Sequence, residues 1–367
     1  AVDPARIENP LLSDALQDAL DEKLHGAATA LCVVLGDRGD ASVLLTADSR
    51  PSPLAAALAA AHPAVRFAAL RGVMGLAPEA PFPGSSRVAP TLIDFAGAGL
   101  GRTAVVATPN LGRSATIAGQ LAATGIDAQP TNNGGEAIRL AQGMDVELVL
   151  IDLAVLRPTV RETVFRLRRQ TPTATTPIGL LAPDGRLEEA KAIAAEHTAV
   201  LAFPRPQNAE AVGEIATRLA EAAPAGLPTA GERAELAAVA RGWAVDVLRD
   251  GPAFYGLRDR SDALQQAVLN AADAQPLLAA LGTPASQLEL LGAAGRATEP
   301  IETRRGAAEA FRQSVDRFGV LLTTDQLQQQ YDRYNASGAA DADTQAVLGD
   351  LLDAIESRRK KTGAVGP

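Results

Sequence analysis

Hydrophobic and polar residues follow two different periods along this chain. In residues 11–96, and again from residue 232 onward, apolar residues recur three and four positions apart, which is typical of amphipathic helices. Between residues 102 and 222, short apolar runs alternate with such helices. These runs are nearly continuous in Val, Leu, Ile and Ala, as in strands of a parallel sheet that is covered on both faces. The pattern therefore predicts an α/β domain that is flanked on both sides by helices.

The N-terminal helical region, residues 1–96, has Gly or Pro between its apolar segments about every dozen residues. The predicted helices span residues 12–23, 27–35, 53–61, 64–76 and 88–95. Within them, the pattern of Ala30–Gly36 returns in Ala69–Gly75, 39 residues later. Helical hairpins repeated at roughly this spacing resemble HEAT repeats, which are armadillo-type units. Such hairpins stack on one another because a single one cannot bury its apolar face alone.

The C-terminal helical region, residues 230–361, is predicted to contain further helices. They span residues 232–249, 261–271, 276–281, 285–293, 303–318, 324–334 and 341–360. Arg305–Ala308 is similar to Arg66–Ala69, so the resemblance to HEAT repeats returns after the α/β segment. We therefore expect one α-helical solenoid that is interrupted by an α/β insert. Two unrelated helical flanks are the alternative.

The α/β segment, residues 102–222, is predicted to contain five strands, each followed by a helix. The strands span residues 103–107, 127–131, 148–152, 178–181 and 200–203, and the helices span residues 111–124, 135–141, 160–170, 187–196 and 209–222. Right-handed crossovers leave few topologies for five such units. The segment therefore predicts a flavodoxin-like, doubly wound parallel sheet of five strands.

The residues at the ends of the predicted strands carry a family resemblance. The third strand ends on a single aspartate, Asp152, as in a receiver domain, the CheY-like module of bacterial response regulators. This resemblance implies that Asp152 occupies the phosphoacceptor position. Receivers have an acidic pair where this chain has Ala107 and Thr108. They also have a Thr or Ser in place of Ala182, and a Lys in place of Arg205.

These departures predict a pseudo-receiver, in which Asp152 does not accept a phosphoryl group. Mg²⁺ prefers carboxylate and phosphate oxygens, so the lone carboxylate of Asp152 predicts weak metal binding. Phosphoryl transfer depends on the charge neutralisation that the metal provides. Arg205 keeps a positive charge, but its planar guanidinium does not replace the point charge of Lys. Because the third and fifth strands end at the same edge of the sheet, we expect an ion pair between Asp152 and Arg205.

Composition and charge exclude several classes of function. The net charge is −9 and the densest basic run is Arg358–Lys361, so no nucleic-acid partner is expected. No segment approaches the roughly 18 consecutive apolar residues of a membrane span. Cys32 is the only cysteine, and the three histidines lack acidic or cysteine partners at ligand spacing, which predicts no disulfide and no metal site. The chain has no catalytic motif or cofactor fingerprint, so it is predicted to have neither an enzymatic activity nor a cofactor.

Two surfaces are candidates for protein binding. Tyr331 and Tyr334 share a helix face with Leu327, which predicts either a packed terminal helix pair or a groove that faces a partner. Tyrosine is frequent at protein interfaces. The receiver resemblance implies a second surface, Leu187–Ala222, because receivers signal through their fourth and fifth elements.

The chain is therefore predicted to be a non-catalytic interaction scaffold that binds a protein partner or a copy of itself. One alternative is a phosphorelay regulator that is phosphorylated on Asp152. Another is a structural subunit of a fibre or coat, since stackable repeats suit head-to-tail contacts. The sequence begins at Ala1 and not at Met, which leaves the compartment open: cytoplasmic, or exported if a signal peptide precedes Ala1.

Overall fold

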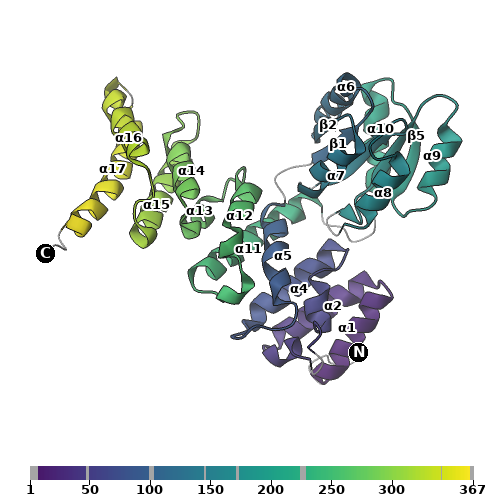
Figure 1. The fold of residues 1–367 in the computed structure, drawn as a ribbon, viewed down its shortest axis with the longest axis horizontal. Helices are drawn as coiled ribbons and strands as arrows, with labels where there is room; N and C mark the ends of the chain where they lie inside the picture. Colours follow the sequence, from purple (N-terminus) through teal and green to yellow (C-terminus); the bar gives the residue numbers. More distant parts are fainter. Residues whose placement is uncertain are drawn as a thin grey trace. The chain divides into compact units, whose positions relative to one another are not determined.

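The computed structural model divides the chain into two compact units, Ala1–Ala237 and Ala238–Pro367. It describes residues 7–46, 49–98, 103–143, 146–170, 173–223, 229–339 and 341–363. The boundary between the units falls inside one helix, α11 (Ala230–Arg249). The first unit holds the N-terminal helices and the α/β domain, and the second holds the C-terminal helices (Figure 1). The finer division into residues 1–96, 102–222 and 230–361 remains a prediction.

The N-terminal helices lie close to their predicted positions. They are α1 (Asn9–Asp21), α2 (His25–Asp37), α3 (Pro53–Ala57), α4 (Pro63–Leu76) and α5 (Val88–Ala96), with short 3₁₀ helices η2 (Ala41–Leu44) and η3 (Ser85–Arg87). Helices α1, α3 and α4 each have a proline in their first turn, where the missing N–H needs no partner. Proline therefore marks helix starts here, as the sequence predicted.

The backbones of helices α2 and α4 lie in close contact where the two helices cross. A Cβ atom added to Gly36 would lie 2.4 Å from the Cα atom of Gly72, and one added to Gly72 would lie 3.0 Å from the carbonyl oxygen of Cys32. Only glycine allows so close a helix crossing. The packing is consistent with a stacked helical region, while its assignment to HEAT repeats remains a prediction.

The α/β domain contains a parallel sheet of five strands, as predicted. The strands are β1 (Thr103–Ala107), β2 (Asp127–Thr131), β3 (Val146–Asp152), β4 (Ile178–Ala182) and β5 (Val200–Pro204). Their order is β2-β1-β3-β4-β5, and each neighbouring pair is parallel. This is the strand order of the flavodoxin-like doubly wound fold, in which β3 is central and β5 lies at an edge.

Helices cover both faces of the sheet. They are α6 (Leu111–Ala122), α7 (Gly134–Gly143), α8 (Val160–Arg168), α9 (Leu187–Ala194) and α10 (Ala209–Glu221). Alternate residues along β3 point to opposite faces. Leu150 packs in a core with α6 and α10, whereas Ile151 packs in a second core with α7, α8 and α9. The near-continuous apolar strands of the sequence are explained by this burial on both faces.

The second unit is a succession of packed helices. After α11 come η5 (Ala253–Tyr255), η6 (Arg258–Arg260), α12 (Ser261–Val268), α13 (Gln275–Leu281), α14 (Pro284–Gly295), α15 (Ile301–Phe318), α16 (Thr324–Ala336), η7 (Ser337–Ala339) and α17 (Ala342–Gly363). Helix α15 packs against α13, α14 and α17. The capping residue of α16 is Thr323, because its hydroxyl accepts the amide of Gln326 in a reciprocal capping box. Among the described helices, none is both long and apolar enough to cross a membrane.

Candidate functional site

The candidate site lies at the carboxyl ends of the strands, where the predicted receiver-pocket residues meet. Asp152 ends β3 and pairs in register with Leu181, and Ala182 ends β4 in register with Pro204. The three strand ends are therefore level with one another. Asp152 has no solvent-exposed surface, so its carboxylate must find its partners inside the protein.

Arg205 supplies those partners. Its Nε donates to Asp152 Oδ2 at 2.6 Å, and its Nη2 donates to Asp152 Oδ1 at 2.8 Å. The backbone N–H of Ala154 donates a further bond to Oδ1, at 2.9 Å. The backbone of Arg205 is itself fixed, because its N–H donates to the carbonyl of Ala182 at 3.0 Å. The ion pair expected from the topology is present, in the two-bond geometry that makes Arg–carboxylate contacts strong.

The pair is asymmetric in its exposure. The Arg205 side chain keeps 26% of its surface in contact with solvent, whereas the Asp152 side chain is fully covered. Hydrogen bonding to Asp152 raises the pKa of the Arg205 guanidinium above its usual value, and the charge of nearby Asp184 acts in the same direction. The Arg205 guanidinium is thus held in its charged form.

The residues at the end of β1 belong to the turn that leads into α6. Ala107 and Thr108 are both fully buried. The Thr108 hydroxyl donates to the carbonyl of Asn110 at 2.7 Å, and the Asn110 side chain accepts the amide of Arg113 as the cap of α6. The hydroxyl at position 108 is therefore used in the turn that leads into α6.

A magnesium ion, which the receiver resemblance implies, does not fit these residues. The side chains of Ala107 and Ala182 offer no oxygen, and both carboxylate oxygens of Asp152 already accept hydrogen bonds. Mg²⁺ needs several oxygen ligands in octahedral geometry. Within the described ranges, no group of three or more His, Cys, Asp or Glu side chains could hold a metal ion.

A second arginine holds the opposite end of the sheet. Arg168, the last residue of α8, donates to the carbonyls of Thr173 (3.1 Å), Thr198 (3.1 Å) and Ala199 (3.3 Å). The last two precede β5. Burial lowers the pKa of Arg168 to about 10. Sequence reasoning missed this role, since nothing in the local pattern distinguishes Arg168 from its arginine neighbours.

A third arginine binds the amino end of β3. Arg233, in the first half of α11, contacts Glu147 at 2.5 Å, and both side chains are about five-sixths buried (15% and 16% exposed). This pair could not be predicted from the sequence, because 86 residues separate its members. It attaches the start of α11 to the α/β domain within the first unit.

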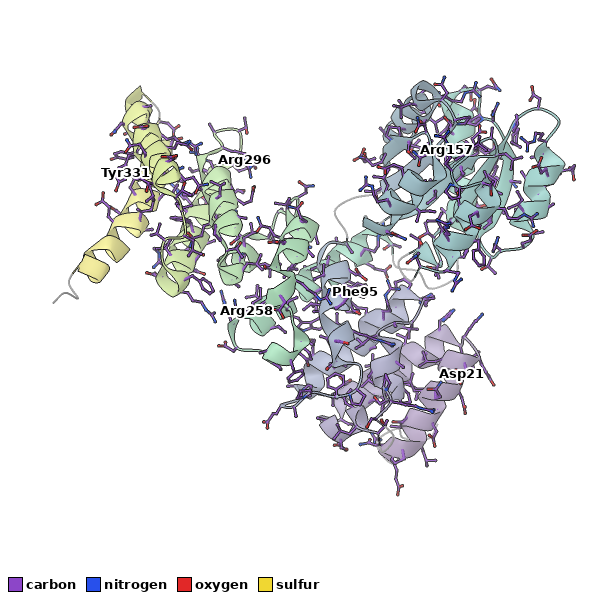
Figure 2. All side chains as sticks on the ribbon, viewed as in Figure 1. Asp21, Phe95, Arg157, Arg258, Arg296 and Tyr331 are labelled. Atoms are coloured by element: carbon purple, nitrogen blue, oxygen red, sulfur yellow. The ribbon has the colours of Figure 1, made fainter. Side chains whose placement is uncertain are left out.

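The two predicted interface tyrosines differ in exposure. Tyr331 is labelled in Figure 2. Its hydroxyl donates to Glu356 on α17 at 3.2 Å, so Tyr331 belongs to the packing of α16 on α17. Tyr334 is 41% exposed. His25 and His62, two of the three histidines, stack with ring centroids 4.4 Å apart. This contact depends on how distant segments of the chain pack together, and no short sequence motif indicates it.

The α/β domain was compared with known proteins together with the rest of the chain, and one solved structure illustrates what it resembles. A solved structure of the chemotaxis response regulator CheY4 of Vibrio cholerae covers 32% of this chain and 98% of its own, at 20% sequence identity and a TM-score of 0.30. A scan against models of protein families finds no match, and neither does a search of curated proteins. The five-stranded sheet and its strand order place the α/β domain in the flavodoxin-like class of doubly wound folds.

Proposed function

We propose that this protein is a non-catalytic interaction scaffold whose receiver-like domain keeps its acceptor aspartate in a permanent ion pair. The observation that carries the proposal is the contact between Asp152 and Arg205, with bonds of 2.6 and 2.8 Å and a fully covered carboxylate. To accept a phosphoryl group, a carboxylate needs an open approach to phosphorus and a neutralising metal. A carboxylate held by a guanidinium and a backbone amide has neither.

The helical regions support the role of a scaffold. In the first unit α2 packs closely on α4, and in the second unit α14 packs on α15 and α15 on α17. Stacked helical pairs of this kind offer long surfaces for other proteins. We propose that these regions are HEAT-like and that they present the receiver-like domain to its partners.

Phosphorylation by a small phosphodonor with Mg²⁺, followed by intact-mass measurement, tests the proposal. We expect the wild-type chain to gain no phosphoryl group. A working receiver in the same mixture shows that the donor is active, and Asp152→Asn identifies any phosphate bound elsewhere. If the wild type gained one phosphoryl group and Asp152→Asn did not, the protein would be a phosphorelay regulator and the proposal would fail.

A further inference from the structure

The outer face of α8 combines positive charge with exposed apolar side chains. Between Arg157 and Arg169 the chain has five arginines and one glutamate, although the protein as a whole carries a net charge of −9. Arg168 points inward to the carbonyls before β5, so the other four arginines supply the positive charge of this face. Leu156 is 64% exposed and Phe165 is 47% exposed. The Arg169 guanidinium lies over the Phe165 ring, 5.5 Å from its centroid. Arginine and aromatic side chains are enriched where proteins bind one another.

Some of these arginines already have partners inside the α/β domain. Arg161 pairs with Glu196 and Arg166 pairs with Glu162, each at 2.7 Å and each largely in water. Exposed pairs of this kind contribute little to stability. In the part of the chain that the structure describes, Arg157 and Arg169 have no carboxylate at ion-pair distance. The α8 face therefore keeps positive charge that the domain itself does not neutralise.

Helix α1 has an outer face of the opposite character. The segment Glu8–Glu22 contains five acidic residues and no basic one. Asp14 and Asp18 are exposed one turn apart, opposite the buried face of the helix. Leu11, at 60% exposure, and Leu24, at 51%, lie near the two ends of this acidic face. Figure 2 labels Asp21 at the end of α1 and Arg157 just before α8.

We propose that the chain binds a second copy of itself, with the acidic face of α1 in one molecule seated on the basic face of α8 in the next. The α8 face from Arg161 to Arg169 and the α1 face from Asp14 to Asp21 are each roughly 10–12 Å long, at about 1.5 Å per residue. Opposite charges select and orient such a contact, and the exposed leucines and Phe165 supply apolar area. The inference rests on the proposed function and names the partner of that scaffold.

This contact joins two different surfaces, so it is heterologous. Each molecule that uses its α8 face leaves its own α1 face open for another copy. Association of this kind continues head to tail, into a ring if the rotation closes and into a filament if it does not. Because its charges lie in water, it weakens as ionic strength rises.

Reciprocal charge reversal in the full-length chain tests the proposal. The first variant carries Arg157→Glu and Arg169→Glu, and the second carries Asp14→Arg and Asp18→Arg. We expect sedimentation velocity to show concentration-dependent self-association of the wild type at low salt. Each variant alone should associate at least about tenfold more weakly, since both of its faces then have the same sign. An equal mixture of the two variants should associate again, because opposite faces are restored between them.

A control variant, Arg113→Glu with Arg87→Glu, lowers the net charge by four, as the first variant does, at exposed positions on α6 and η3. It should associate like the wild type. The proposal is overturned if the wild type stays monomeric at all concentrations, if either variant associates normally, or if the mixture does not recover. Binding of a labelled oligonucleotide that only the first variant loses, with a monomeric wild type, would assign the α8 face to nucleic acid instead. None of these outcomes bears on phosphorylation of Asp152, so the proposed function is tested separately.

Discussion

Removal of the Arg205 guanidinium should destabilise the centre of the sheet. In Arg205→Met the carboxylate of Asp152 stays buried with one remaining donor, the backbone amide of Ala154. Breaking a buried ion pair by deleting one partner typically costs about 3–5 kcal/mol. Arg205 is about one-quarter exposed, so water can partly replace it, and we expect a loss of about 2–3 kcal/mol.

Hydrogen exchange measured by mass spectrometry on the full chain can detect this loss. A destabilisation of about 2–3 kcal/mol corresponds to exchange roughly 30- to 150-fold faster in amides that exchange through opening of the domain. The relevant peptides cover β3 and β5. Arg205→Lys keeps the charge but loses the two-bond geometry, so its exchange should fall between that of wild type and Arg205→Met.

The double variant Asp152→Leu with Arg205→Met decides whether the buried charge is the cause. With both charges replaced by apolar groups, no uncompensated carboxylate remains, so exchange should return toward the wild-type rate. Arg113→Met, which truncates an exposed arginine in the first turn of α6, should change nothing measurable. Wild-type exchange in Arg205→Met, or equal exchange in the single and double variants, would refute the reasoning.

Two further predictions concern the N-terminal helices. Gly36→Ala should destabilise the region by about 1–3 kcal/mol in hydrogen exchange of α2 and α4, since its Cβ would lie 2.4 Å from Gly72 Cα. Gly26→Ala, on the same helix with no atom within 4 Å of the added Cβ, should be neutral or stabilising, and equal behaviour of the two would contradict this account. Cys32 is fully buried and burial raises its thiol pKa to about 12, so alkylation at neutral pH should require unfolding. Rapid modification of the native protein, seen by intact mass, would show that the thiol is accessible.

The fold of the α/β domain could be predicted from the sequence because each strand and helix is indicated by the residues within it. Apolar runs that end at Ala107, Asp152 and Ala182 specify buried parallel strands, and right-handed crossovers reduce the possible topologies to a few. Once that topology is given, the ends of β3 and β5 face one edge. The pair between Asp152 and Arg205 could therefore be predicted across 53 residues.

Other contacts could not be predicted, because no short stretch of sequence indicates them. The bond between Glu147 and Arg233 depends on where α11 begins after a linker, and the stacking of His25 on His62 depends on how hairpins pack. The basic face of α8 was overlooked because its arginines are interspersed with apolar residues, unlike the continuous run Arg358–Lys361. Charge on a helix face becomes visible only after its buried side has been assigned.

The two arginines at the ends of β5 have a consequence for how molecules of this protein can join. Strand β5 lies at the edge of the sheet, and such strands invite pairing or exchange with another chain. Arg168 holds the carbonyls just before β5, and Arg205 holds Asp152 just after it. A domain swap of β5 would have to release both arginines at once. Both ends of this edge strand are therefore held to the rest of the domain, which disfavours its exchange with another molecule.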